Sequence, residues 1–226
     1  MNNWNIQTIE AFVQQLAVGC IAHGYWFYVI GTIPSGKSPL AVDAKLVDRY
    51  GPELSRWTRA RRKRAGLANL RYMRHGHFFV LLATHGEHTF FECEPFHDVR
   101  RNPIRFAGYS IGCGRGIDGR WHASVRMDLD QYRTLKGYFL EVAAKMKVED
   151  LALVFHSIPV EPYAPVRRQL LNILRAVNRI RRPAGLQEVP VQALRLRRQP
   201  CRVFDVPEPA VFAEHKQIPV DLHAGI

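Results

Sequence analysis

The chain has 226 residues, of which 47% are hydrophobic and 23% charged, as in an ordinary globular protein of one or two domains. Its net charge of +12 favours an acidic or phosphate-bearing partner, and its four cysteines form no C-x-x-C pair, which excludes the usual zinc fingers and a disulfide framework. No apolar run approaches the roughly 20 residues that span a bilayer, and no secretory or lipidation signal opens the chain. We therefore expect a soluble, cytoplasmic protein with no membrane partner.

The first part of the chain is expected to fold as a helix, a strand and two further helices. Apolar residues at helical spacing predict the first helix, and the aromatic and β-branched run YWFYVI predicts a buried strand. The two later helices are separated by Gly51-Pro52, which ends the first of them. In chain order these elements are predicted over residues 5–22, 25–30, 39–50 and 53–64.

The stretch GTIPSGKS, residues 31–38, matches the phosphate-binding pattern G-x-x-x-x-G-K-[ST] letter for letter. Pro34 removes one of the backbone N–H donors that such a loop uses, and Pro39 disfavours the helical conformation that the pattern requires at Ser38. A hydrolytic site also needs an acidic residue at the end of a second apolar strand to hold magnesium, and the candidate strands present no aspartate there. We interpret the stretch as a turn that leads into a helix.

The middle of the chain favours strands. Residues 68–84 indicate two strands that meet at a His-Gly-His sequence, or one long bent strand. HTFFECEPF, residues 88–96, and HASVRM, residues 122–127, are also expected to be strands. Residues 98–120 mix arginine with glycine and proline, which predicts a strand with an exposed loop.

The last part of the chain favours helices. A helix is predicted from Asp128 or Asp130 through about Lys147, and the short apolar run LALVFHSI after it suits a strand or a helix. Another helix, over residues 166–182, has an apolar stripe and a basic opposite side. After Pro183 the chain is interrupted by prolines, and we expect it to pack in extended form along the body or to be mobile.

Runs of sequential strands with helices between them favour an α+β fold over a doubly wound parallel sheet. We expect a ferredoxin-like, mostly antiparallel sheet core with an N-terminal helix and a basic C-terminal helical extension. The predicted domain boundary separates a core of residues 1–158 from a basic helix with an extended tail, residues 159–226.

Positive charge is concentrated in residues 56–64, 166–182 and 195–202, which together carry +16 and leave about −4 for the rest of the chain. Arginine supplies permanently charged, planar groups that match phosphate oxygens, so this pattern favours nucleic acid as the partner, although charge alone does not distinguish DNA from RNA. Solvated helix faces, or a basic patch that docks other proteins of a larger nucleoprotein complex, are the alternatives. The residues expected to contact phosphates are Arg56, Arg59, Arg61, Arg62, Lys63, Arg64, Arg167, Arg168, Arg175, Arg179, Arg181 and Arg182.

Aromatic residues lie among these and other arginines in the sequence. Trp57 belongs to the first basic segment, and Tyr72, Tyr109 and Trp121 lie near further arginines. Aromatic rings between arginines can stack on unpaired bases while the guanidinium groups bind phosphates. The alternative is that the rings fill the core and the arginine side chains cover it.

His75 and His77, in the sequence RHGHFFVLL, are two residues apart on an expected strand, so both imidazoles could bind one metal ion. This stretch resembles the His-hydrophobic-His strand of the HUH endonucleases, which include rolling-circle replication initiators and single-tyrosine transposases. Gly76 stands where that family has a bulky apolar residue. The alternative is that the two histidines belong to a polar hairpin turn.

The resemblance implies a metal-dependent enzyme that nicks DNA and is linked to a mobile element or a genome-defence system. In that family two histidines hold a divalent metal ion, here Mg²⁺ or Mn²⁺, which polarises the scissile phosphate. A tyrosine on a later helix attacks that phosphate and is joined to the 5′ end. The matching helix would be DLDQYRTLKGYF, which offers Tyr132 with Lys136 one turn away, and Tyr138 as a substitute. A degenerate site would leave a DNA-binding protein.

Overall fold

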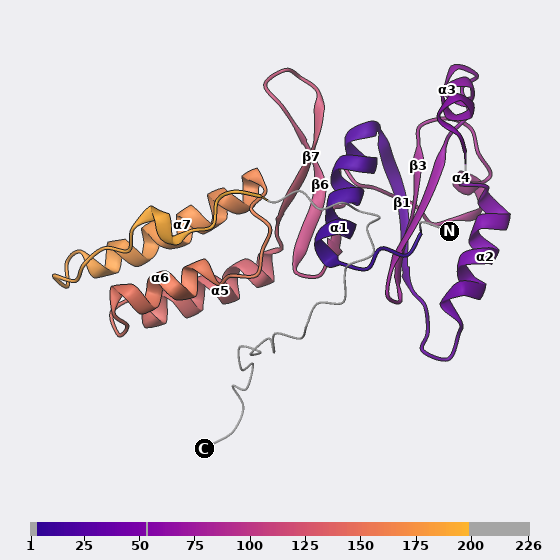
Figure 1. Cartoon of the computed structure of the whole chain (residues 1–226). Coiled ribbons are helices and arrows are strands. Elements are labelled where there is room, and N and C mark those ends of the chain that lie inside the picture. Colours follow the sequence, from indigo (N-terminus) through magenta and orange to yellow (C-terminus); the bar gives the residue numbers. More distant parts are fainter. Residues whose placement is uncertain (1–3, 53, 199–226) are drawn as a thin grey trace.

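Two antiparallel β-sheets organise the chain, whose computed structural model describes residues 4–52 and 54–198 (Figure 1). The first sheet has the strand order β2-β3-β1-β4 and contains β1 (Tyr25–Thr32), β2 (Leu70–His75), β3 (Phe78–Thr84) and β4 (His97–Asp98). The second has the order β5-β6-β7 and contains β5 (Ile104–Phe106), β6 (Tyr109–Arg115) and β7 (Trp121–Met127). With the helices, these sheets confirm the predicted α+β class and its mostly antiparallel pairing.

Helices cover both faces of the four-stranded sheet. One face is covered by α1 (Ile9–Gln14), which continues as a π-helix, η1 (Gln15–Cys20), and a 3₁₀ turn, η2 (Ile21–His23). The other face is covered by α2 (Pro39–Tyr50) and α4 (Phe90–Cys93). The basic helix α3 (Arg56–Arg64) precedes β2 and stands above this layer in Figure 1.

Alternation along the strands assigns side chains to the two faces of this sheet. Val80 of β3 belongs to the apolar cluster that includes Phe12 of α1, whereas its neighbour Leu81 belongs to the cluster that includes Tyr50 of α2. The strands β2 and β3 are joined by a tight turn in which Gly76 has a φ of 58°, a conformation that favours glycine. The predicted pair of strands in residues 68–84 is therefore confirmed.

Residues 88–96, expected to be a strand, instead form α4 and the loop before β4. His88 Nδ1 accepts a hydrogen bond from the N–H of Phe90 at 3.0 Å, at the start of this helical turn. The turn places the ring of Phe91 edge-on against Phe27, with 5.3 Å between the ring centres. Because this local aromatic cluster buries the side chains without strand pairing, tertiary packing overrides the β-propensity of the segment.

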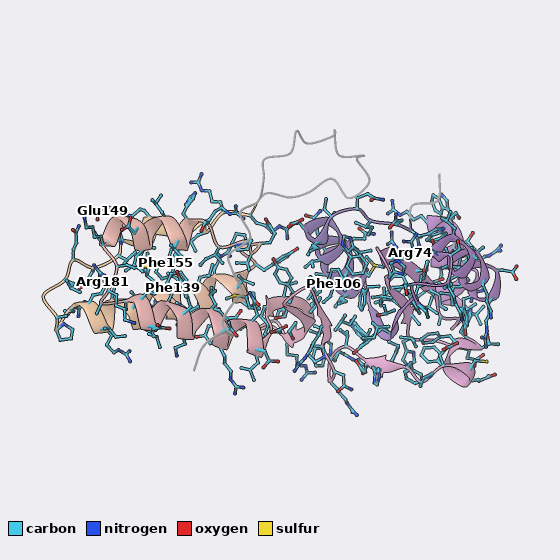
Figure 2. The ribbon with its side chains drawn as sticks, turned by 90° about the horizontal axis from the view of Figure 1, so that it is seen from below. Arg74, Phe106, Phe139, Glu149, Phe155 and Arg181 are labelled. Carbon is cyan, nitrogen blue, oxygen red and sulfur yellow. The ribbon has the colours of Figure 1, made fainter. Side chains whose placement is uncertain are left out.

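Three helices form one end of the molecule. The helix predicted from Asp128 or Asp130 through Lys147 is shorter, because α5 (Leu129–Val142) ends in a turn and α6 (Val148–His156) returns beside it. This reversal stacks the rings of Phe139 and Phe155 at 3.9 Å between their centres (Figure 2). The run LALVFHSI thus belongs mainly to a helix, and α7 (Ala164–Arg181) closely matches its predicted bounds. A short 3₁₀ turn, η3 (Val191–Ala193), follows α7.

One apolar cluster runs from the sheets into this helical end. It includes Phe12 of α1, Ile111 of β6, Phe139 of α5 and Ile173 of α7. Residues on both sides of the predicted boundary at residue 158 therefore share one core. The division into two domains stays a prediction, and the predicted extended tail from residue 199 onward lies outside the described residues.

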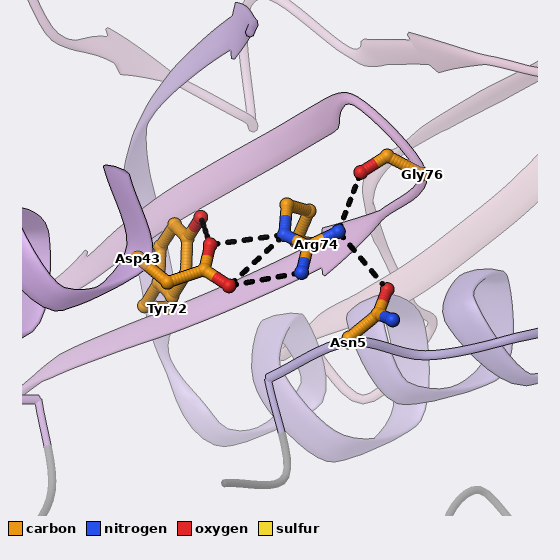
Figure 3. A network of polar contacts seen from close by, with 5 residues as sticks. All are labelled: Asn5, Asp43, Tyr72, Arg74 and Gly76. Carbon is orange, nitrogen blue, oxygen red and sulfur yellow. Dashed lines mark hydrogen bonds and ion pairs between the residues drawn. The ribbon is translucent and has the colours of Figure 1, made fainter. Parts of the chain in front are cut away.

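A buried ion pair joins α2 to the four-stranded sheet (Figure 3). Arg74 of β2 donates from Nη2 to Oδ2 of Asp43 and from Nε to Oδ1, each at 2.9 Å. The hydroxyl of Tyr72 donates to the same carboxylate at 2.5 Å, and burial together with this bond raises the pKa of Tyr72. Arg74 also donates to the carbonyl of Gly76 at 2.6 Å and to Asn5 at 3.2 Å. The network therefore ties the hairpin and the N-terminal segment to α2.

Candidate nucleic-acid interface

The helix α3 carries the first cluster of predicted phosphate-contacting residues. Its N-cap is Ser55, whose side chain accepts a hydrogen bond from the N–H of Thr58 at 3.1 Å. Basic side chains fill its last turn, where positive charge interacts favourably with the negative end of the helix dipole. No residue of α3 is fully buried. Polar contacts, and not an apolar stripe, must therefore hold the helix on the protein.

Two arginines of α3 provide such contacts. Arg62 donates from Nη2 to the carbonyl of Ala68 at 2.9 Å, and Arg59 donates from Nη1 to the carbonyl of Leu54 at 2.9 Å. The side-chain amide of Asn69 donates to the carbonyl of Arg59 at 3.1 Å. These bonds use part of the donor capacity of both arginines, so Arg62 in particular serves to attach the helix.

A second side of α3 is open to solvent. Trp57, Arg61 and Arg64 follow one another at spacings of four and three residues and share this side. The Trp57 side chain is 82% exposed, although a ring of this size is usually buried in large part. The ion pairs of the described residues involve neither arginine. The outer side of α3 thus offers an aromatic ring between two unneutralised guanidinium groups.

A third side of α3 borders a cavity of about 630 Å³. Three residues of α3 line one side of the cavity: Arg56, Arg59 and Lys63. Arg71 of β2 and His23 of η2 line the other side. The described residues around the cavity include no acidic side chain. Its walls are therefore suited to an anion.

Two buried groups next to the cavity stay neutral and so leave its positive charge uncompensated. Burial raises the pKa of the Cys20 thiol to about 11, although the charges of Arg71 and Arg59 act in the opposite direction. Burial also raises the pKa of Tyr25, again opposed by the same two arginines. Arg71 was not among the predicted contact residues, because its neighbours in the sequence are buried strand residues. Only the tertiary structure brings it to α3.

The exposed side of α7 carries the second predicted cluster. The apolar stripe of the helix packs into the core, which leaves Arg168, Arg175 and Arg179 exposed, at spacings of seven and four residues. Of the remaining predicted cations, Arg167 donates to a backbone carbonyl at 3.2 Å, and Arg182 pairs with an acidic side chain at 2.9 Å. Three arginines therefore form the open basic stripe of α7.

Arg181 has a different role from its neighbours on α7. Its side chain is only 2% exposed and lies beside the stacked Phe139 and Phe155 at the far end of the helical layer (Figure 2). It donates hydrogen bonds to the carbonyls of Ala143, Met146 and Gln187 at 2.6, 2.9 and 2.6 Å. Arg181 thus holds the ends of α5 and α7 together, and we leave it out of the proposed binding surface.

The helices α3 and α7 lie toward opposite ends of the molecule, with the β6–β7 hairpin between them (Figure 1). Arg115 of the hairpin lies 5.9 Å from the ring centre of Trp121. Arg100, from the turn between β4 and β5, lies 4.4 Å from the ring centre of Trp26 and 5.8 Å from that of Trp121, but it is paired with Asp98 at 2.6 Å. A ligand that contacts both basic helices must be extended, as a nucleic-acid strand is.

The four aromatic residues expected among arginines separate into two pairs. Trp57 is largely exposed, and Trp121 is partly exposed on the β6–β7 hairpin. Tyr72 and Tyr109 are buried, and the hydroxyl of Tyr109 accepts a hydrogen bond from the N–H of Glu161 at 2.8 Å. The two tyrosines are therefore core residues, and only the two tryptophans are placed to stack on a ligand.

His75 and His77 lie at the turn between β2 and β3. The Nδ1 of His75 is 2.8 Å from the carbonyl oxygen of Ile6, and the Nδ1 of His77 is 2.9 Å from that of Ile33. Each imidazole thus has its own backbone partner, which leaves Nε2 for another ligand. Within residues 4–52 and 54–198, no group of three or more His, Cys, Asp or Glu side chains is placed to hold a metal ion.

The candidate tyrosines lie on α5, together with Lys136. Tyr132 is partly buried against the main core, and Tyr138 is 43% exposed, with its ring 5.5 Å from that of Phe139. Figure 2 places Phe139 far along the molecule from Arg74, the residue before the first histidine. The structure therefore does not bring Tyr138 to the histidines.

In the GTIPSGKS stretch, Gly31 and Thr32 end β1, Ile33 is buried, and residues 34–38 form an exposed turn before α2. The N–H of Lys37 donates to the carbonyl of Pro34 at 2.9 Å. Ser38 is the N-cap of α2 in an extended conformation, with φ −67° and ψ 121°, and Pro39 is the first helical residue. A phosphate-binding loop of this pattern would have Lys37 and Ser38 in the first turn of the helix. The geometry agrees with the interpretation as a turn.

Comparison with protein-family models, with curated proteins and with solved structures found no match. The resemblance to the HUH endonucleases therefore stays a prediction. Across the part of the chain that the structure describes, no helix has the length and apolar character needed to cross a membrane.

Proposed function

We propose that the protein binds nucleic acid through the exposed cations of α3 and α7. The observation that carries this proposal is the outer side of α3, where the 82% exposed Trp57 lies on the same side as Arg61 and Arg64. A base can stack on such a ring while the two guanidinium groups bind adjacent phosphates. DNA as the preferred polymer, and a link to a mobile element, rest on the resemblance to the HUH endonucleases.

The open stripe on α7 supplies a second contact with the phosphate backbone. Arg168, Arg175 and Arg179 project from the side opposite the buried stripe, so they can bind phosphates without disturbing the core. Since α3 and α7 lie apart in the molecule, the two contacts act on different stretches of one extended strand or duplex. Binding should then depend steeply on salt.

The test is binding of the protein, freed of nucleic acid, to labelled single- and double-stranded DNA and RNA over a series of salt concentrations. Two double variants, Arg61→Glu with Arg64→Glu and Arg168→Glu with Arg175→Glu, should weaken binding and reduce the salt slope by about 1 for each lost phosphate contact. The matched control reverses two exposed charges elsewhere, Lys45→Glu with Arg133→Glu. Equal losses in the control would reject a localised binding surface.

Metal-dependent nicking of DNA is the second candidate function. It is supported by the free Nε2 atoms of His75 and His77, because a metal-bound histidine usually donates its other ring N–H to a backbone carbonyl or a carboxylate. The two imidazoles would hold Mg²⁺ or Mn²⁺, and the ion would supply charge to polarise a phosphate. A covalent protein–DNA adduct that disappears in Tyr132→Phe and persists in Tyr138→Phe would establish this function, because the structure keeps Tyr138 away from the histidines. The absence of an adduct with the unaltered protein would reject it.

We further propose a cytoplasmic location, which the free thiols of Cys20, Cys93 and Cys113 support. A basic subunit of a larger nucleoprotein complex is the remaining alternative. It predicts weak binding of naked nucleic acid together with tight co-purification of partner proteins, whereas strand binding by the isolated protein would contradict it.

A further inference from the structure

The cavity beside α3 has a positive wall that is not filled by the protein's own acidic groups. Arg56, Arg59 and Lys63 form it on the helix side and Arg71 on the side of β2. Arg59 and Arg71 are half-buried, and each donates one hydrogen bond to a backbone carbonyl, at 2.9 and 3.2 Å respectively. Arg71 also forms a hydrogen bond with the side chain of Cys20. A guanidinium has five N–H donors, so each of these two arginines can still bind an oxyanion through two parallel hydrogen bonds.

Asn69 gives the cavity a second chemical feature. It lines the cavity and is only 4% exposed, and its Nδ2 donates to the carbonyl of Arg59 at 3.1 Å. The Oδ1 of the same amide is buried and has no hydrogen-bond partner. The bond to Arg59 sets the orientation of the amide, because turning it over would place two acceptors against each other. The unsatisfied acceptor thus belongs to a residue of the cavity wall but is itself covered, so a ligand donor reaches it only after the side chains around it shift.

A ligand that matches both the cationic wall and the Asn69 acceptor must have an anionic group and a hydrogen-bond donor. Sulfate at neutral pH would occupy the cations and leave Oδ1 of Asn69 without a donor, because it carries no proton. A nucleoside phosphate has both parts, since its phosphate is the anion and its sugar hydroxyl or base amine is the donor. The volume of about 630 Å³ lies within the roughly 300–1,000 Å³ of small-molecule sites.

We propose that this cavity binds a phosphorylated nucleoside, with its phosphate against Arg59 and Arg71 and a hydroxyl or amino group donating to Oδ1 of Asn69. Lys63 and Arg56 add charge from the exposed part of the same wall. The nucleoside phosphate is either the 5′-phosphorylated end of a strand or a free mononucleotide. A strand end is the source implied by the adjacent outer side of α3, and in that form the inference rests on the proposed function.

Two oligonucleotides of identical sequence, one with a 5′-phosphate and one with a 5′-hydroxyl, test the strand-end form. We expect the phosphorylated strand to bind about tenfold more tightly, because the free 5′-hydroxyl makes no charge-assisted hydrogen bonds. The advantage should be reduced in Arg56→Gln with Lys63→Gln, because Arg59 and Arg71 remain while half of the cationic wall is lost at exposed positions that keep the core intact; an unchanged advantage would contradict binding of the phosphate in this cavity. It should persist in the matched variant Arg61→Gln with Arg64→Gln, which weakens both oligonucleotides alike. Thermal unfolding of each variant confirms that it is folded.

Titration with deoxynucleoside 5′-monophosphates, the matching nucleosides and sulfate tests the free-ligand form. Mononucleotide binding without oligonucleotide binding would support the cavity and overturn the proposed function. Equal binding of the two oligonucleotides, with no mononucleotide binding, would overturn the cavity ligand and leave strand binding intact. Sulfate binding as tight as that of the mononucleotides would overturn the part assigned to Asn69.

Discussion

Arg74 and Asp43 form an ion pair with 2.9 Å between Nη2 and Oδ2, in a site where their side chains are only 6% and 9% exposed. They come from β2 and α2, which are far apart in the sequence. The pair therefore joins a surface helix to the sheet through charges that have left water. Two further hydrogen bonds supply the additional polar contacts that a buried ion pair requires (Figure 3). The hydroxyl of Tyr72 donates to Asp43, and Arg74 donates to the carbonyl of Gly76.

Removing one partner of this pair should be costly. We expect Asp43→Ala to lower the free energy of unfolding by about 3–5 kcal/mol, because it leaves the Arg74 guanidinium buried without a counter-charge. Urea unfolding followed by circular dichroism measures the change. Asp48→Ala, at an exposed position of the same helix, is the control and should stay within about 0.5 kcal/mol of the unaltered protein. Similar effects of the two variants would contradict a structural role for the ion pair.

Two arginines on α7 should separate stability from binding. Arg181→Met removes hydrogen bonds to three carbonyls and should destabilise the protein by about 3 kcal/mol. Arg179→Glu should leave the thermal midpoint nearly unchanged, since its side chain is exposed, but it should weaken nucleic-acid binding and lower the salt slope. Thermal unfolding and a salt-dependent binding series give both readouts. Loss of stability in Arg179→Glu would remove it from the binding surface.

Acidification should destabilise the protein through His88. Burial lowers the pKa of His88 below its ordinary 6.5, and the charge of Arg62 acts in the same direction. The folded state thus keeps His88 neutral where the unfolded chain already binds a proton. The stability that His88 contributes is complete above about pH 6.5 and is lost as the pH falls through the lowered pKa. The measurement is the thermal midpoint between pH 7.5 and about pH 5.

The control for this effect is His88→Asn. Asparagine can still accept the hydrogen bond from the N–H of Phe90 but does not titrate, so the variant should lose less stability between pH 7 and pH 5 than the unaltered protein. Parallel curves for the two proteins would show that other groups cause the acid sensitivity.

Trp57 should matter for binding and not for folding. Trp57→Ala should weaken binding of single-stranded DNA about 5- to 100-fold, because a stack between a base and an aromatic ring contributes about 1–3 kcal/mol. Trp57→Phe keeps an aromatic face and should retain most of the affinity. Fluorescence anisotropy with a labelled oligonucleotide measures both, and the thermal midpoint of Trp57→Ala should not fall. Unchanged affinity in Trp57→Ala would remove base stacking from the proposed function.

Local sequence patterns determined much of the fold. The apolar stripe of α7 predicted a helix within a few residues of its bounds, and the His-Gly-His sequence predicted the turn at which Gly76 takes its positive φ. These features depend on neighbouring residues, through helical periodicity and the backbone freedom of glycine. The concentration of charge in α3 and α7 is likewise a property of the sequence alone. In HTFFECEPF the local pattern predicted a strand, which was wrong, because aromatic packing against residues from elsewhere in the chain favours the helical turn.

Tertiary structure alone decided which arginines are available to a ligand. Arg179 and Arg181 are both basic residues near the end of α7 and are equivalent by charge alone. Arg181 lies four residues after the buried Val177, on the same side of the helix, and its guanidinium donates hydrogen bonds to three backbone carbonyls. Arg71 and Asn69 meet α3 only because pairing of β2 with β3 sets the face to which each residue points. The sequence by itself determined a basic α+β protein with two arginine-rich helices. Long-range packing and strand register determined the cavity and the free cations, because both join residues that no local pattern connects.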